Sequence, residues 1–198
     1  MKIKSLFLLL FFIFLLSADL FSQTSGKGGL KVYLDKSLHF SLEYPSDFKV
    51  AVGARAKSDD SAFMEPGQGK KLVKVVPIRI PGKYHGWYEF NIWRDTDPKA
   101  KCGEPDEDEL NLSVPISPVT DSPKTREIDG QTFYAYTGSE GGMSKGMSVV
   151  GFRSKVSDKC WQIQSVTYQV SAFDDFKSFD EKIINNAFER FIKSFRFN

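Results

Sequence analysis

The chain has 198 residues, of which 41% are hydrophobic and 14% aromatic, and its formal net charge is +2. This length favours one domain with a sizeable hydrophobic core. The near-neutral charge, with no run of basic residues after Lys4, argues against nucleic acid as the main partner, because phosphate binding needs a basic stripe.

The first residues have the pattern of an export signal. Two lysines precede an unbroken apolar run of eleven residues, Leu6–Leu16. Spanning a bilayer takes about 20 residues, so this run fits the apolar part of a signal peptide instead. We predict a signal peptide over residues 1–22, cleaved after Ser22 or after Ala18; the alternative is an anchor that is retained. We expect no transmembrane span in the mature chain, which would be periplasmic or secreted.

The chain has two cysteines, Cys102 and Cys160, and both follow the signal. Export implies an oxidising compartment, where an even cysteine count predicts one disulfide. The alternative is two unpaired buried thiols. A zinc site is disfavoured, because the two cysteines are far apart and no set of His or Asp ligands accompanies them.

Residues 23–29 are small and polar and predict a flexible start, after which residues 30–198 form a single predicted domain. Alternation of apolar and polar residues is typical of strands with one buried face. Strands are predicted on this basis at Leu30–Leu34, Leu38–Tyr44, Leu72–Ile80, Tyr88–Ile92, Thr132–Thr137, Met147–Val156 and Cys160–Val170.

The connections carry turn residues. Ser46–Asp47 predicts the cap of a short helical turn, and Ile128–Asp129–Gly130 predicts a hairpin turn. Three polar or glycine-bearing segments are expected to be loops: Gly53–Lys71, Asp95–Pro123 and Gly138–Gly146. Short turns between successive strands predict a mainly antiparallel sheet, and with a final helix the fold class is α+β.

The last segment predicts a long amphipathic helix. Apolar residues recur there at steps of three and four, which places them on one stripe of a helix: Phe176, Phe179, Ile183, Ala187, Phe188, Phe191, Ile192 and Phe195. Ser178 and Glu181 have the spacing of a capping box, which predicts that the helix starts at Ser178. We expect the stripe to pack on the sheet; the alternative is a surface that binds a lipid or a partner.

Candidate sites are few. The Asp95–Pro123 segment contains an acidic cluster that we predict to be an interaction surface: Glu104, Asp106, Glu107, Asp108 and Glu109. Together with Asp95 and Asp97, these oxygens are the ligands that calcium prefers, but the spacing of an EF-hand is missing, so we expect no cofactor and keep calcium as the alternative. His39 and His85 lie near no recognisable nucleophile motif, and no catalytic residue is predicted.

Two segments resemble the PsbP-like superfamily. The first is HFSLEYPSDFKV from His39, and the second is FERFIKSFRF over Phe188–Phe197. The Asp129–Gly130 turn also fits, whereas Phe48 stands where such proteins commonly have Trp, and the Cys102 loop has no counterpart. The resemblance implies a central antiparallel sheet flanked by helices, an α/β/α sandwich. It carries over no catalytic residue, because these domains are mostly non-enzymatic.

These observations lead to three hypotheses about function. The first is an exported, non-catalytic binding or interaction module of the bacterial cell envelope, with an unidentified envelope protein as partner. The second is a periplasmic binder of a small ligand or lipid, with a pocket between helix and sheet lined by Trp87, Trp93 and the phenylalanines. The third is an enzyme without a recognisable motif. Fold alone does not choose among them.

Overall fold

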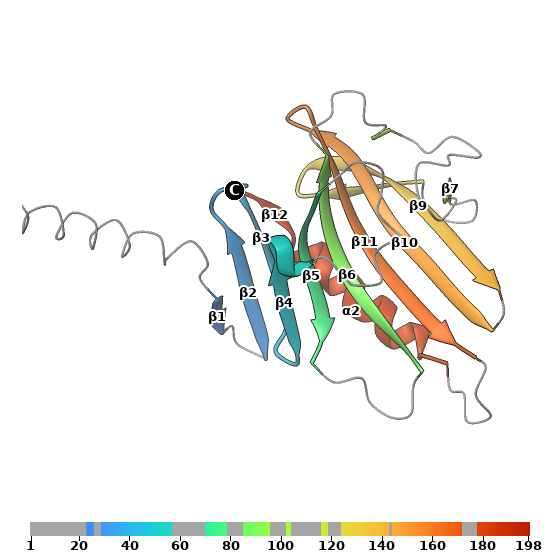
Figure 1. Ribbon diagram of the computed structural model, residues 1–198. Helices are drawn as coiled ribbons and strands as arrows, with labels where there is room; N and C mark the ends of the chain where they lie inside the picture. Colours follow the sequence, from blue (N-terminus) through green and yellow to red (C-terminus); the bar gives the residue numbers. More distant parts are fainter. Residues whose placement is uncertain are drawn as a thin grey trace, which may run out of the picture.

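The computed structural model describes residues 23–25, 29–56, 70–78, 85–95, 102–103, 116–118, 124–142, 144–171 and 178–198. These residues form two antiparallel sheets and one α-helix (Figure 1). Within these ranges, no helix has the length and apolar character needed to cross a bilayer.

The smaller sheet brings the two ends of the domain together. Its strand order is β1–β2–β3–β12, with bounds Gln23–Ser25, Leu30–Asp35, Phe40–Pro45 and Arg196–Phe197. The C-terminal strand β12 pairs with β3, so that Phe197 lies opposite Phe40. β1 lies within the segment 23–29, for which the sequence predicts a flexible start.

The larger sheet has the order β4–β5–β6–β11–β10–β9–β7, and β8 also pairs with β9. The bounds are Phe48–Val52 for β4, Lys70–Pro77 for β5, Gly86–Asp95 for β6, Ile116–Pro118 for β7, Thr125–Ile128 for β8, Gln131–Gly142 for β9, Lys145–Val156 for β10 and Lys159–Val170 for β11. A short 3-10 helix, η1 (Gly53–Ala56), follows β4. Consecutive strands β8 to β11 pair as hairpins, and the first of these turns, at Asp129–Gly130, was predicted from its residues.

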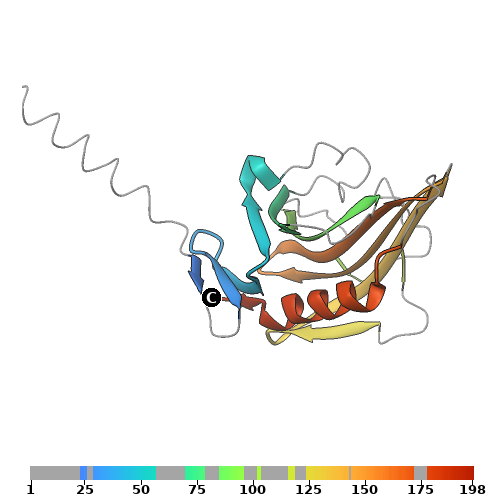
Figure 2. The ribbon, with the colours of Figure 1, turned by 90° about the horizontal axis from the view of Figure 1, so that it is seen from below.

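The helix α2 (Glu181–Ser194) runs along one face of the larger sheet (Figure 2). Its buried side chains are Ile184, Phe188, Phe191 and Ile192. The rings of Phe188 and Phe191 each lie 5.4 Å from the ring of Phe90 on β6, centroid to centroid. One hydrophobic cluster includes these residues together with Phe40 and Leu42 of the smaller sheet, so the core joins both sheets and the helix.

The helix is shorter than predicted. It begins after Asp180, whose side chain accepts a hydrogen bond from the Lys182 backbone N–H, so the predicted start at Ser178 is wrong. One member of the predicted stripe is also wrong: Ile183 is 62% exposed, and the next residue, Ile184, is buried instead. Phe176 lies outside the described residues.

The prediction of an α/β/α sandwich is wrong. The described part of the chain contains one α-helix, which covers a single face of the larger sheet, and most of it is antiparallel strand. Antiparallel strands are joined by tight turns and need no crossover helices. The opposite face carries buried polar and charged side chains beside a smaller apolar cluster of Tyr136, Met147, Val149 and Val166.

Two connections also differ from prediction. Ser46–Asp47 is a turn that leads straight into strand β4, rather than the cap of a helical turn. The glycine-bearing segment 138–146, predicted to be a loop, continues β9 to Gly142 and starts β10 at Lys145. Pairing with a neighbouring strand overrides the weak strand propensity of glycine, because strand preference depends strongly on context.

Candidate functional site

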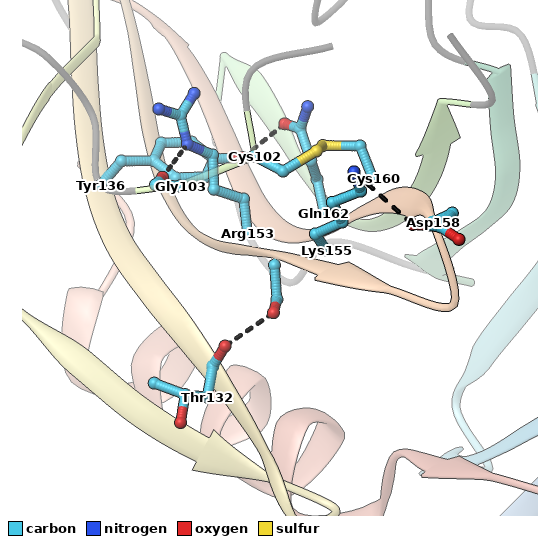
Figure 3. Close-up of a disulfide and its surroundings, with 10 residues drawn as sticks. Cys102, Gly103, Thr132, Tyr136, Arg153, Lys155, Asp158, Cys160 and Gln162 are labelled. Atoms are coloured by element: carbon cyan, nitrogen blue, oxygen red, sulfur yellow. Dashed lines mark hydrogen bonds and ion pairs between the residues drawn. A yellow bond between two sulfur atoms is a disulfide. The ribbon is translucent and has the colours of Figure 1, made fainter. Parts of the chain in front are cut away.

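The predicted disulfide between Cys102 and Cys160 is confirmed. Cys160 lies at the start of β11, opposite Lys155 of β10 and Asp95 of β6, and both cysteines are buried. The bond therefore holds the segment Cys102–Gly103 against the larger sheet (Figure 3). Closing a loop of this length contributes about 4 kcal/mol in the chain-entropy model.

The predicted acidic surface, residues 104–109, lies outside the described residues, and it stays a prediction. Within the described ranges, no three His, Cys, Asp or Glu side chains lie together as a metal site requires. Asp95 belongs to β6, while Asp97 lies outside the described residues, so calcium binding is untested. His39 lies in an exposed turn with a positive φ of 55°, rather than on a strand.

The tryptophans of β6 do not face the helix. Tyr88 contacts Phe179, and Phe90 contacts α2, so the alternate residues Trp87 and Trp93 lie on the opposite face of the sheet. Packed phenylalanine rings occupy the space between α2 and the sheet. The structure therefore places the tryptophans away from the lipid pocket that the sequence predicted beneath the helix.

That opposite face carries a buried set of polar side chains, which we call the polar layer. It runs across the central strands and consists of Lys71, Lys74, Glu89, Asn91, Trp93, Tyr136, Arg153, Gln162 and Gln164. The register explains why they meet: Trp93 lies opposite Gln162, Asn91 opposite Gln164, and Gln162 opposite Arg153. Most of these side chains are buried.

A buried carboxylate is at one end of the polar layer. Glu89 is 4% exposed, and its Oε1 accepts hydrogen bonds from Lys71 Nζ at 3.0 Å and from Asn91 Nδ2 at 2.8 Å. Lys74 Nζ lies 3.8 Å from the other carboxylate oxygen. Burying an ion is costly unless it is paired and hydrogen-bonded, and this arrangement meets both conditions for Glu89.

Tyr136 is at the other end, and a glycine makes room for it. A Cβ at Gly151 would lie 2.4 Å from Tyr136 Cζ, so the ring can cross over β10 because residue 151 has no side chain. The Tyr136 hydroxyl lies 3.0 Å from Gln164 Oε1 and 3.1 Å from Gln162 Oε1 on β11. Burial raises the pKa of Tyr136 while the charge of Arg153 opposes the shift, so the hydroxyl stays a donor.

The disulfide adjoins this layer. Arg153 Nε donates a hydrogen bond of 2.8 Å to the carbonyl oxygen of Gly103, the residue after Cys102. Figure 3 shows Arg153, Gln162 and Tyr136 near the disulfide. The covalent link and this hydrogen bond together fix one border of the polar layer.

Two buried atoms in the polar layer lack partners. Asn91 Oδ1 and Trp93 Nε1 have no hydrogen-bond partner among the residues that the structure describes, although the two residues are 1% and 3% exposed. The Asn91 amide is oriented by its Nδ2, which must face the Glu89 carboxylate. One acceptor and one donor therefore remain unused on the same face, on residues that are two apart along β6.

Sequence reasoning missed the polar layer. Alternation along β6 was read as a buried face and a solvent face, whereas six consecutive residues, Tyr88–Trp93, are buried. The signal was the occurrence of charged and amide residues at alternate positions of two strands, Glu89 and Asn91, and Gln162 and Gln164. Lys71 and Lys74 are three residues apart, and a register shift between Lys71 and Val73 places them opposite Trp93 and Asn91. Only the strand order shows that these positions are neighbours.

Comparisons with known proteins assign neither a family nor an activity to this chain. No protein-family model matches the chain, and no curated protein matches it. The chain is similar to the solution structure of cyanobacterial PsbP (CyanoP) from Synechocystis sp. PCC 6803, at 12% identity and a TM-score of 0.42, over 87% of this chain and 95% of that one.

Proposed function

We propose that this protein is an exported, non-catalytic binding module of the cell envelope, and that the polar layer holds a small polar ligand. The observation that carries the proposal is the pair of unpartnered atoms, Asn91 Oδ1 and Trp93 Nε1. Leaving a buried donor or acceptor unsatisfied costs about 1–3 kcal/mol for each group. A ligand that satisfies both atoms recovers this cost on binding.

Neighbouring side chains hold the Asn91 amide and the Trp93 ring in position. Glu89 holds the Asn91 amide, and Lys71 Nζ lies 5.0 Å from the centre of the Trp93 ring. Groups that are already oriented lose little conformational entropy on binding, which favours affinity. The ligand must donate to Asn91 and accept from Trp93, as a molecule bearing hydroxyl or amide groups does.

The other parts of the proposal have separate support. The disulfide is compatible with an oxidising compartment, and the apolar N-terminal run has the pattern of an export signal. The non-catalytic part rests on the sequence, in which no nucleophile and base form a recognisable motif.

Native mass spectrometry of the protein purified gently from its own cell envelope tests the proposal. We expect a bound small molecule that is lost in the variant Trp93→Phe, which removes the donor. The matched control is Trp87→Phe, since Trp87 lies on the same face but stacks on Tyr168, 5.7 Å between ring centroids, and should keep the ligand. Bare protein, together with a high-resolution crystal structure in which one ordered water bonds both atoms, would overturn the proposal.

A further inference from the structure

A hollow of about 450 Å³ lies where strands β9 and β11 end and β10 begins. Small-molecule sites usually have volumes of roughly 300–1,000 Å³. Its lining consists of Ser139, Gly141, Ser144, Lys145, Gly146, Met147, Ser148, Thr167, Gln169 and Ser171. None of these residues belongs to the polar layer, so the hollow is a separate feature of the sheet.

The register explains why the sheet is hollowed here. Ser148 of β10 lies between Ser139 and Thr167, which forms a row of three hydroxyl-bearing residues across the strands. Two residues further along, Gly146 lies between Gly141 and Gln169 on the same face. A Cβ at Gly146 would have nothing within 4 Å, whereas one at Gly141 would lie 3.4 Å from the Lys145 carbonyl oxygen, so the open space lies at Gly146.

The hollow lies on the helix side of the sheet, beyond the start of α2. Ser148 is four residues before Phe152, so the two share a face, and the Phe152 ring lies 6.3 Å from that of Phe188 on α2. The backbone N–H of Phe179, just before the helix, donates to Gln169 Oε1 at 3.4 Å. Most of the lining therefore belongs to the helix side, whereas Lys145 and Met147 alternate with Gly146 and Ser148, and Met147 packs with Tyr136 on the other face.

Hydrogen bonds hold the rim in place. The backbone N–H and the hydroxyl of Ser171 both donate to the carbonyl oxygen of Ser144, at 2.7 and 3.2 Å. These bonds attach the β9–β10 turn to the end of β11. A rim fixed in this way loses little entropy when a ligand binds.

The side chains that line the hollow favour a negatively charged ligand. Five of the lining residues carry hydroxyls, which donate hydrogen bonds, and Lys145 is the one charged side chain among the described residues that line the hollow. Hydrogen bonds from hydroxyl and ammonium groups to an oxyanion are shorter and stronger than those between neutral groups. Among the described residues that line the hollow, none carries a carboxylate that would repel an anion.

We propose that this hollow binds a small molecule that carries an oxyanion, a carboxylate or a phosphate. The Ser139–Ser148–Thr167 row donates hydrogen bonds to it, and Lys145, at the rim where β10 begins, balances its charge. The proposal does not depend on a ligand in the polar layer. The lining of the hollow shares no residue with the polar layer, so different variants test the two proposals.

The test is a titration of the exported protein with inorganic phosphate, citrate and glycerol at constant ionic strength, followed by amide chemical shifts. We expect phosphate or citrate to shift the signals of Gly141 and Gly146, and the more effective anion identifies the class. Gly146→Leu fills the hollow and should abolish the shifts, whereas Gly142→Leu, which also has open space around its Cβ but does not line the hollow, should not.

A charge control completes the experiment. Lys145→Met should weaken anion binding about tenfold, as the loss of one charge-assisted contact does. Lys159→Met, which removes an exposed lysine at the other end of β11, should leave binding unchanged. The proposal is overturned if neither anion shifts the amide signals, or if glycerol alone does. It is also overturned if a variant and its matched control lose anion binding equally. These outcomes do not depend on whether Trp93→Phe loses the ligand of the polar layer.

Discussion

The two faces of the larger sheet are built from the same strands but are stabilised in different ways. On the helix side, Phe90 packs against the phenylalanines of α2, and the contacts are apolar. On the other side, Glu89 and Asn91, its neighbours along β6, are equally buried but depend on specific partners. Apolar packing is non-directional, whereas a buried polar group is costly when any one partner is missing. Mutations should therefore affect the two faces differently.

The largest effect is expected on the helix side. Phe191→Ala should lower the free energy of unfolding by about 3–5 kcal/mol, because Phe191 is 1% exposed and its removal leaves a cavity. Denaturant unfolding measures this difference. The matched control is Ile183→Ala on the exposed side of the same helix, for which we expect a change within about 0.5 kcal/mol. Equal costs for both variants would mean that the helix does not pack as described.

In the polar layer, we expect a loss of stability when one member of the Lys71–Glu89 ion pair is removed. Glu89→Leu leaves Lys71 buried without its carboxylate and should cost about 3 kcal/mol. The double variant Lys71→Met with Glu89→Leu should cost less than Glu89→Leu alone, because it replaces the ion pair with apolar groups of similar size. Urea unfolding of both variants measures this coupling. Additive costs would show that Lys71 and Glu89 act independently.

A smaller effect is expected where Tyr136 crosses β10. Gly151→Ala places a Cβ against the Tyr136 ring and should destabilise the protein by about 1–3 kcal/mol through overpacking. Gly146→Ala on the same strand is the control, since its Cβ meets nothing within 4 Å. Thermal unfolding compares the two variants. A neutral Gly151→Ala would contradict the close approach of the ring.

The smallest effect concerns an ion pair at the edge of the helix. Arg126 donates to both carboxylate oxygens of Glu189, at 2.6 and 3.0 Å, and lowers the pKa of Glu189. A lowered pKa in the folded state gives stability that is present above the ordinary carboxyl pKa and is lost as the pH falls through the folded value. Because Glu189 is 46% exposed, Arg126→Met should cost less than about 1 kcal/mol at pH 7.

Unfolding measured from pH 7 down to pH 3 checks this prediction. The difference between the original chain and Arg126→Met should shrink as the pH falls. Arg126→Met retains an apolar side chain over the Phe152 ring, which Arg126 approaches to 5.5 Å, so the comparison isolates the charge. A difference that is constant across this pH range would attribute the effect to packing.

Much of the local structure could be predicted from the sequence. The alternation of Phe40, Leu42 and Tyr44 predicted a strand with one buried face, and all three are buried in β3. The Asp129–Gly130 turn was predicted as a hairpin, and both residues have positive φ there. The disulfide could be predicted from the cysteine count together with the predicted export signal. These features depend on residues close together in the chain or on the compartment.

The first strand predicted from the sequence, which is β2 in the structure, shows where local patterns fail to predict burial. Leu30, Val32 and Leu34 predicted it by their alternation, but the structure buries Tyr33 and Asp35 instead. Asp35 is satisfied by the Tyr33 hydroxyl and by the backbone N–H of Leu38, which lie 3.1 and 3.0 Å from its carboxylate oxygens. Which face of a strand is buried depends on what packs against it, and those partners are distant in the sequence.

The sequence by itself determined the apolar stripe of the C-terminal helix, most strand positions and the cysteine pair, because periodicity and turn chemistry act over a few residues. Only the tertiary structure decided that β6 lies between β5 and β11, and that a single helix covers one face. That strand order brings Lys71, Glu89 and Gln164 into one buried layer and aligns Gly141 with Gly146 over the hollow. Both candidate sites arise from cross-strand neighbours, which no local pattern specifies.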